Sequence, residues 1–360
     1  MRLKNNQASM IKEIIPIEEN NGTLTYCEPL NHRCTENGTP YIQDGAINIF
    51  MNMPCPLKVV AKKALKAFAD EYNATHEVPV YSPVFMEGDS KGIEGELKYC
   101  KTEDELPEIL VASGLHTVLS SDFKPRFIDS GVYLPATTPR MLEHMTPDIR
   151  RLVTEKNIAV VGTGFWSIVC DLSMPMDVPY PKQWMDLIKP EYKDLITVHG
   201  YHGKASIAAL LLLFRERGGD DAILRFGGNL HNIWHFAEIL KRLDSDDKRR
   251  TPLNLLPNAA TVQMPCRKNA GILEFDEGPL LAPLLMYVKA SKIESCQPVV
   301  DFFLGREMRR TLRLGDFHLA DDYDWTAPRC FPDWEIMLQS DYDVLNADLN
   351  KKLNEGAFGI

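Results

Sequence analysis

Strand-like apolar runs alternate with helix-like segments along this chain, and this alternation limits the possible folds more than any other feature. Residues 46–51 have the composition of a buried strand, and residues 57–72 carry apolar side chains at 3.6-residue spacing with lysines on the opposite face. Further strands are predicted at 78–84 and 109–112. Because parallel strands need helical crossovers, this order predicts an α/β fold with a mostly parallel, helix-covered sheet.

The second half of the chain repeats this pattern after a break. The strand-like run 158–161 continues into Gly162, Thr163 and Gly164, where we expect the chain to cross into a second unit. The elements predicted beyond this point are strands at 195–199, 259–263 and 272–275 and helices at 205–217, 229–243 and 298–312.

These elements predict two lobes joined by two crossing strands, each lobe a mostly parallel sheet covered by helices. Lobe one comprises residues 45–161 and 272–330, and lobe two comprises residues 162–271. Residues 1–44 are expected to form an irregular N-terminal extension. Residues 331–360 are expected to form a C-terminal segment that packs on lobe one.

The charge balance argues against several classes of partner. The chain has 40 basic and 50 acidic residues and a formal net charge of −10, whereas nucleic-acid and anionic-membrane binders need basic surfaces. The densest basic run, residues 248–250, follows acidic residues and is predicted to be a solvated loop. No apolar run approaches the roughly 20 residues of a membrane-spanning helix. We therefore expect no nucleic-acid partner and no membrane insertion.

The N-terminal residues and the cysteines bear on the compartment. No apolar run of signal-peptide type follows Met1, so the sequence as given predicts a cytoplasmic protein, or an extracytoplasmic one if a leader has been removed. The extension could serve a protein partner. The 8 cysteines are irregularly spaced and are predicted to be free thiols. Cys27 and Cys34 are further apart than the usual zinc-ligand spacing.

Ligands of open α/β sheets bind beyond the carboxyl ends of the strands. Three such ends are predicted to meet in one cleft: the loop with Cys55, the segment after Ser82, and the segment from Ser113 to His116. Thr163 lies at the domain crossing. All five residues are predicted to bind the ligand.

Residues 199–206 join a predicted strand to a predicted helix start, where unpaired backbone N–H groups attract anions. His199, His202, Lys204 and Ser206 are therefore predicted to bind a negatively charged group. Free imidazoles change charge near pH 6.5, so affinity for an anion should rise as the pH falls from about 8 to 6. The alternative is an ordinary capped turn with solvated histidines.

Four further polar residues have both a functional and a structural interpretation. Asn229 is predicted to cap the next helix or to face the cleft. Glu277 lies in a turn near the hinge, where it could recognise an amine or a metal, or act as a cap. His231 and His235 are four residues apart on a predicted helix, and packing is favoured over metal binding there because aromatic residues flank His235.

The tripeptide Met-Pro-Cys occurs twice, ending at Cys55 and at Cys266. A thiolate from each, with His116 or His199, would suit a soft or borderline transition-metal ion, which is the one cofactor predicted. A reactive thiol near a helix start and two unrelated buried cysteines are the alternatives.

Two stretches carry a resemblance to a known family. Residues 181–194 read PKQWMDLIKPEYKD, and residues 275–279 read FDEGP, followed by PVVDFFLGRE at 298–307. They are similar to segments of the type II periplasmic (solute-binding) proteins of ABC transporters, particularly the iron- and small-anion-binding branch. The resemblance covers roughly residues 45–330 and implies a two-lobed fold that closes on a ligand. This chain departs from the family in lacking an export signal and the adjacent pair of tyrosines that iron-binding members use.

The residues and the resemblance together predict a non-catalytic solute-binding protein that closes two lobes on a small anionic ligand or a metal ion. The alternative is a cytoplasmic metal-handling protein or an enzyme on the same fold that uses Cys and His residues of the cleft. No Ser-His-Asp order, Walker loop or G-x-G-x-x-G motif supports an enzyme.

Overall fold

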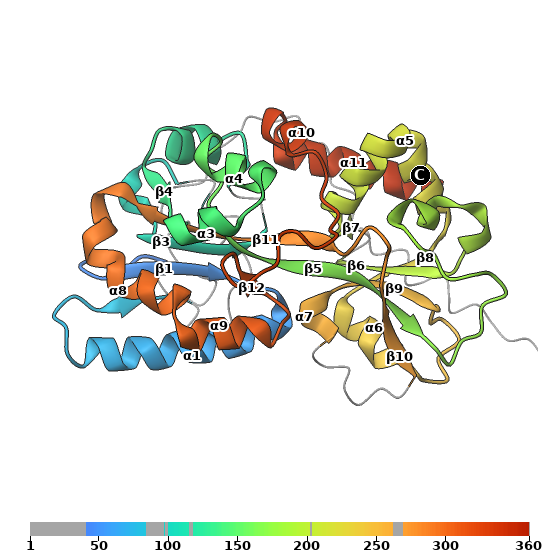
Figure 1. The fold of residues 1–360 in the computed structure, drawn as a ribbon, viewed down its shortest axis with the longest axis horizontal. Helices are drawn as coiled ribbons and strands as arrows, with labels where there is room; N and C mark the ends of the chain where they lie inside the picture. The colour runs from blue at the N-terminus through green and yellow to red at the C-terminus, as the bar shows by residue number, and fades with distance from the viewer. Residues whose placement is uncertain are drawn as a thin grey trace, which may run out of the picture. The chain divides into compact units, whose positions relative to one another are not determined.

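One mixed sheet with helices on both faces runs through the part of the chain that the structure describes (Figure 1). The structure is a computed structural model that describes residues 41–83, 97, 100–114, 118–201, 204–261 and 269–359. These residues belong to the second of two units, Arg33–Ile360. The first unit, Met1–His32, lies outside the described residues, as does the predicted N-terminal extension up to residue 40.

Within the described residues the twelve strands have the order β2-β1-β3-β11-β5-β9-β6-β7, with β10 and β12 also on β5, β4 on β11, and β8 on β6. Their bounds are β1 Ile47–Asn52, β2 Val80–Tyr81, β3 Ile109–Ser113, β4 Tyr133–Pro135, β5 Val160–Asp171, β6 Ile196–Tyr201, β7 Lys204–Ala205, β8 Leu230–Trp234, β9 Leu253–Pro257, β10 Ala270–Leu273, β11 Leu280–Lys289 and β12 His318–Leu319.

Parallel pairs lie on both sides of β11 and β5 in this order. Strand β1 is parallel to β2 and β3, and β6 is parallel to β8 and β9. The long strands β5 and β11 run antiparallel to their neighbours and join the two parallel groups. The predicted α/β architecture with parallel, helix-covered sheets is therefore confirmed.

Helices cover both faces of the sheet. In Figure 1, α1 (Cys55–Asn73) and α9 (Arg306–Arg313) lie below β1, while α3 (Pro139–His144) and α4 (Pro147–Thr154) lie above it. The remaining helices are α5 Ala208–Gly228, α6 Phe236–Arg242, α7 Asn258–Thr261, α8 Ile293–Leu304, α10 Trp334–Gln339 and α11 Tyr342–Phe358. Within the described residues no helix is both long and apolar enough to cross a membrane.

The glycines at the predicted crossing allow close packing rather than flexibility. Strand β12 pairs with Gly162 and Thr163 of β5. A Cβ on Gly162 would lie 2.3 Å from the carbonyl oxygen of His318, and one on Gly164 would lie 2.5 Å from the ring of Phe317. Only glycine lets the chain segment at 317–319 lie directly on β5.

Several predicted elements differ in the structure. The predicted helix 229–243 is a strand, β8, followed by the short helix α6, because Leu230–Trp234 pairs with β6. The predicted strand 259–263 starts as the helical turn α7, and the strand lies before it as β9. The predicted helix at 298–312 is two helices, α8 and α9, separated at Gly305.

The C-terminal segment contacts both predicted lobes. Glu335 of α10 lies 3.5 Å from Arg151 and 3.8 Å from Lys156 in predicted lobe one, while α11 contacts α5 of predicted lobe two. The contact is close because it has glycine on both sides: a Cβ on Gly227 would lie 2.3 Å from the Leu353 oxygen, and one on Gly356 would lie 2.1 Å from the Leu224 oxygen. Two polar bonds support the same packing, Asn350 Oδ1 to the Ala205 N–H and Asp348 to Arg215.

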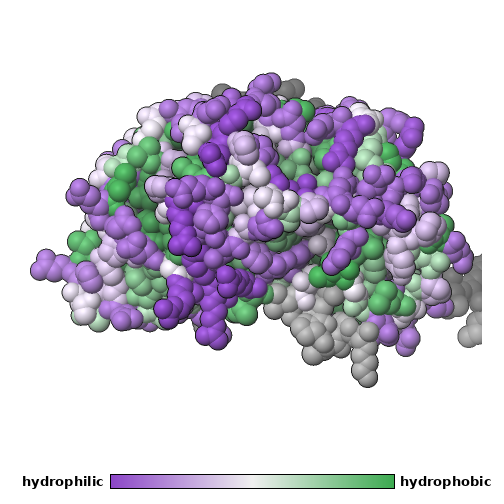
Figure 2. All heavy atoms as spheres, viewed as in Figure 1, coloured by the Kyte–Doolittle hydropathy of each residue, from purple (hydrophilic) through white to green (hydrophobic). Residues whose placement is uncertain are grey.

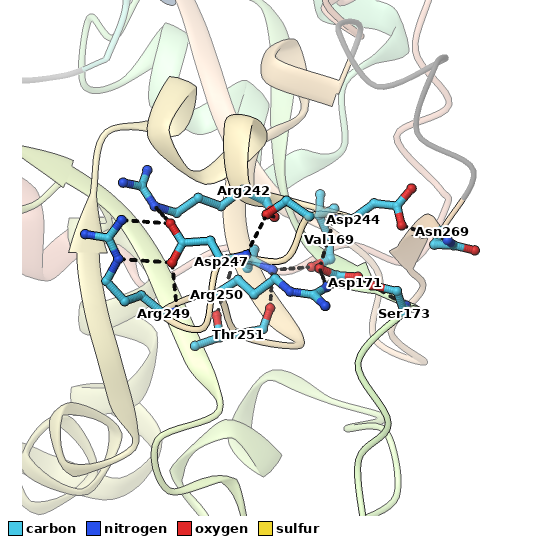
Figure 3. Close-up of polar contacts among 12 residues, drawn as sticks. Val169, Asp171, Ser173, Arg242, Asp244, Asp247, Arg249, Arg250, Thr251 and Asn269 are labelled. Carbon is cyan, nitrogen blue, oxygen red and sulfur yellow. Dashed lines mark hydrogen bonds and ion pairs between the residues drawn. The ribbon is translucent and has the colours of Figure 1, made fainter.

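The acidic and basic run before β9 is a loop in which Lys248 and Arg249 are exposed, as predicted, and a network of ion pairs holds this loop in place (Figure 3). Arg250 donates to the Asp171 carboxylate at 2.6 Å, and that carboxylate is completely buried. Arg249 and Arg242 both bind Asp247. Burial alone would raise the pKa of Asp171, but hydrogen bonds from Ser173 and Arg250 outweigh it and lower the pKa. The network fixes the end of β5 to the chain that enters β9.

Candidate functional site

Strand ends from the two parallel groups face each other where α1 meets α7. Helix α1 starts three residues after β1 ends, and α7 follows β9 directly. The two helices are in contact. Beside them, Asn258 at the start of α7 donates a hydrogen bond to Asp316, which follows α9, at 2.7 Å. The carboxyl ends of β1 and β9, one from each parallel group, therefore lie close together, and such strand ends are where open α/β sheets bind ligands.

The two predicted serines of this region bind the backbone. The Ser82 hydroxyl is completely buried and donates to the Ile49 oxygen at 2.7 Å. The half-buried Ser113 hydroxyl donates to the Asn52 oxygen at 3.4 Å. Both hydroxyls therefore tie neighbouring segments to β1. Cys55 is the first residue of α1, its side chain is not described, and His116 lies outside the described residues.

Thr163 lies in β5 beside a small, largely apolar hollow. Its side chain is buried, and its hydroxyl donates to the Gly164 oxygen at 2.8 Å. The hollow beside it is lined otherwise by apolar side chains, including Ile149, Leu281 and Trp334. Strands β11 and β12 pair with both edges of β5 at this residue, and ligand binding by Thr163 stays a prediction.

The loop 199–206 differs from the predicted helix mouth. Helix α5 begins at Ala208 rather than near Ala205, because Lys204 and Ala205 form β7 in a hairpin with β6. The Ala205 N–H donates to Asn350, and the Ser206 N–H donates to the His199 oxygen. Two amides expected to hold an anion are therefore occupied. Lys204 and Ser206 are exposed, and His202 lies outside the described residues.

His199 is a buried, neutral imidazole. Its Nδ1 accepts the Phe236 N–H at 3.1 Å, and 8% of the residue is exposed. Burial, and then the neighbouring His235, lower the pKa of His199 to about 4. The charge change predicted for this residue between pH 8 and 6 therefore does not occur.

His199 lies within a group of aromatic side chains at the end of β6. Ring centroids lie 6.1 Å away for Trp166, 5.5 Å for Tyr201 and 5.5 Å for His235. Tyr201 is 46% exposed, and its ring lies 4.7 Å from that of His235. This group is not evident from the sequence because its members come from β5, β6 and the residue before α6. The one local signal is the histidine and tyrosine at the end of β6.

Asn229 and Glu277 have structural roles. Asn229 ends α5 instead of starting a helix, and its amide donates to the oxygens of Leu187 and Lys189. Glu277 accepts the Trp184 N–H at 2.6 Å and the Arg217 guanidinium at 2.5 Å. Burial would raise the pKa of Glu277, but these hydrogen bonds lower it. The Asn229 amide nitrogen and both Glu277 carboxylate oxygens thus bind other parts of the chain.

The two stretches that carry the family resemblance contact each other. Trp184 is completely buried, its indole N–H donates to the Gly278 oxygen at 3.1 Å, and its ring lies 4.5 Å from that of Phe275. The Asp276 N–H also donates to the Lys182 oxygen. These shared residues therefore hold the two stretches together.

The predicted metal set is not assembled within the described part of the chain. There, no three His, Cys, Asp or Glu side chains gather as a metal site would require. Cys266 and His116 lie outside the described residues, and the Cys55 side chain is not described. His231 and His235 do not share a helix face, because His231 lies in β8 and His235 precedes α6. The metal site stays a prediction.

Solved structures share this fold across most of the chain. The apo ferric ion-binding protein A of Pasteurella haemolytica is 11% identical, with a TM-score of 0.61 over 88% of this chain and 100% of that one. A periplasmic thiamin binding protein is 12% identical, with a TM-score of 0.56 over 89% and 98%. The spermidine/putrescine substrate-binding protein PotD of Streptococcus pneumoniae is 14% identical, with a TM-score of 0.51 over 82% and 95%.

At these low identities, the structural similarity shows the fold alone, which is a two-lobed periplasmic-binding-protein fold. No curated protein sequence matches the chain. The sequence profile of bacterial extracellular solute-binding proteins, however, matches residues 104–340, which is more than half of the chain. The protein therefore belongs to the bacterial extracellular solute-binding protein family.

Proposed function

We propose that this protein binds a small organic solute between the strand ends of its two parallel groups. The observation that carries the proposal is the meeting of α1 with α7, next to the Asn258–Asp316 hydrogen bond. Closure around a ligand at such a place removes water and strengthens each polar contact made there.

The side chains favour a planar or cationic solute over a small anion. Trp166, His199, Tyr201 and His235 gather at the end of β6, where Tyr201 is 46% exposed, and aromatic rings attract flat rings and ammonium groups. At the predicted anion site, the backbone N–H groups of Ala205 and Ser206 already donate to other parts of the chain, and His199 is neutral. The exposed Lys204 is the remaining support for an anion in the described part of that loop.

A thermal-shift screen tests the proposal. The compounds are putrescine, spermidine, thiamine, citrate, phosphate, sulfate, Zn²⁺ and Fe³⁺. A compound present at about 100 times its Kd should stabilise the protein by about 2.7 kcal/mol. We expect at least one amine or aromatic compound to raise Tm, and sulfate to leave it unchanged.

Two exposed tyrosines provide the variant and its matched control. Tyr201 is 46% exposed in the aromatic group, and Tyr180 is 42% exposed outside it. Tyr201→Ala should weaken the binding of the active compound about tenfold, since an aromatic or cation–π contact contributes roughly 1 kcal/mol or more. Tyr180→Ala should leave the affinity unchanged. No Tm shift with any compound, or equal effects of the two variants, would contradict the proposal.

Metal handling is the second candidate, favoured by the contact of α1 with α7. Cys55 starts α1, and the second Met-Pro-Cys tripeptide begins three residues after Thr261, the last residue of α7. Elemental analysis of anaerobically purified protein tests it. Stoichiometric metal that is lost in Cys55→Ser would favour this candidate, and metal-free wild-type protein would reject it.

A further inference from the structure

Asn258 and Asp316 join two parts of the chain that the expected domain division places in different lobes. Asn258 starts α7 at the end of β9, and Asp316 lies between α9 and β12. The Asn258 Nδ2–H donates to Asp316 Oδ2 at 2.7 Å. Asn258 is 7% exposed and the Asp316 side chain is 44% exposed, so the donor end of this bond is shielded from water and the carboxylate is partly solvated. A hydrogen bond from an amide to a carboxylate is stronger than one between two neutral groups.

Asp316 is held in place on its own side. Its backbone has φ = 54°, a left-handed conformation that Asp and Asn adopt more readily than most residues. Its other carboxylate oxygen lies 2.9 Å from His318 Nε2. His318 in turn belongs to β12, which lies directly on Gly162 of β5. The acceptor is therefore fixed relative to the crossing strands.

The orientation of the Asn258 amide follows from its partner. A carboxylate accepts hydrogen bonds and cannot donate them, so the amide nitrogen must face Asp316. The amide oxygen, Oδ1, is then directed elsewhere, and it is buried with no hydrogen-bond partner. A buried carbonyl oxygen without a donor is unfavourable, so this arrangement is complete only when a donor reaches Oδ1.

We propose that Asn258 couples closure of the lobes to the solute: its N–H holds Asp316, and its Oδ1 receives an N–H or O–H donor of the solute. The second half of this statement rests on the proposed solute-binding function. We call the Asn258–Asp316 hydrogen bond the latch. Without a donor to Oδ1, the cost of the unpaired oxygen offsets the latch, so the closed and open arrangements are close in free energy. A solute with a suitable donor removes that cost, whereas an anion without donors does not.

The latch is tested in solute-free protein by double electron–electron resonance. Spin labels are carried by non-natural amino acids at positions 66 in α1 and 241 in α6, which are both exposed, so that the native cysteines are not modified. Asn258→Asp places two carboxylates together and should lower the closed-to-open ratio at least tenfold. The exchange variant Asn258→Asp/Asp316→Asn restores one donor and one acceptor and should return the ratio to within about threefold of wild type.

A matched control is Asn232→Asp, which alters an amide in β8 that binds the Thr197 hydroxyl and the Arg249 oxygen. It should leave the distances unchanged. Unchanged distances in Asn258→Asp, or a natively folded exchange variant that stays open, would overturn the latch. If Asn258→Asp fails to fold, the exchange variant decides: wild-type distances support the pairing, and open distances reject it.

The predicted hydrogen bond from the solute to Asn258 Oδ1 is tested by thermal shift. The compounds are putrescine, spermidine and thiamine, which carry N–H donors, and sulfate, which carries none at neutral pH. Any Tm increase that a donor compound gives should fall by at least half in Asn258→Ala. An equal increase in wild type and Asn258→Ala, or a response to sulfate, would overturn this predicted hydrogen bond. If no compound changes Tm, the proposed function fails, and the distance measurements still decide the latch.

Discussion

The chemistry of His199 is set by its burial, which the sequence around it does not reveal. A histidine after a strand and before glycine suggested a titratable ligand at neutral pH. In the structure it lies under Phe236 and among aromatic rings, and its pKa is about 4. It therefore acts as a neutral hydrogen-bond acceptor.

This depressed pKa predicts a pH dependence of stability. The unfolded chain protonates His199 near pH 6.5, whereas the folded protein does so only near pH 4. Protonation therefore favours unfolding as the pH falls from 6.5 to 4, and the effect is absent above pH 7. Between pH 7 and pH 5 this one residue should cost about 2 kcal/mol of stability. Urea unfolding of wild type and His199→Gln at both pH values measures the difference. An equal loss in both proteins would contradict the assignment.

Glu108 and Lys289 form a buried ion pair away from the candidate site. Lys289 is 4% exposed, and its Nζ lies 3.1 Å from Glu108 Oε1, while Glu108 Oε2 accepts two N–H groups of Asn48. Glu108→Gln leaves the ammonium without a counter-charge and should reduce the free energy of unfolding by about 3 to 5 kcal/mol.

Two controls separate the charge effect from a general loss of packing. Adding Lys289→Met to Glu108→Gln removes the unpaired charge and should recover part of the stability. Lys66→Met breaks the exposed pair with Asp70 and should change stability by no more than about 0.5 kcal/mol. Urea denaturation measures all three variants. A loss for Glu108→Gln as small as that for Lys66→Met would show that the pair is solvated.

Among the elements, β5 carries the packing that joins the two parallel groups. It pairs with β11 and β12 near Thr163 and with β9 from Trp166 to Cys170. Gly162→Ala would force a Cβ to 2.3 Å from a backbone oxygen, and the backbone of β12 would have to move.

We expect Gly162→Ala to reduce stability by about 2 to 3 kcal/mol through overpacking. The matched control is Gly271→Ala in β10, where the nearest atom is a side-chain carbon of Leu172 at 3.7 Å. That variant should be neutral or slightly stabilising. Thermal or urea unfolding compares them, and equal stabilities would refute the proposed role of Gly162.

Local patterns predicted most of the elements with strong periodicity. The strand at 46–51, the helix at 57–72 and the strand at 109–112 correspond to β1, α1 and β3. The failures lie where tertiary pairing overrides local preference. Residues 230–234 form a strand only because β6 lies beside them, and the strand predicted at 259–263 begins instead as the turn α7.

For the whole molecule, the alternation of strands and helices predicted the fold class, and the Trp184 and Phe275 segments identified the family. The candidate site was predicted only in its general place, at the strand ends. Its described parts, the aromatic group around His199 and the Asn258–Asp316 pair, join residues 30 to 60 positions apart in the chain. No local pattern reports such distant pairs, so the sequence did not show them.

The central claim is that one solute contacts the strand ends of both parallel groups. Hydrogen–deuterium exchange, with and without the screened compound that raises Tm most, tests it directly. We expect slower exchange to appear together at the start of α1, in α7 and at the end of β6. Protection confined to one of the two groups, or at sites remote from all three segments, would contradict it.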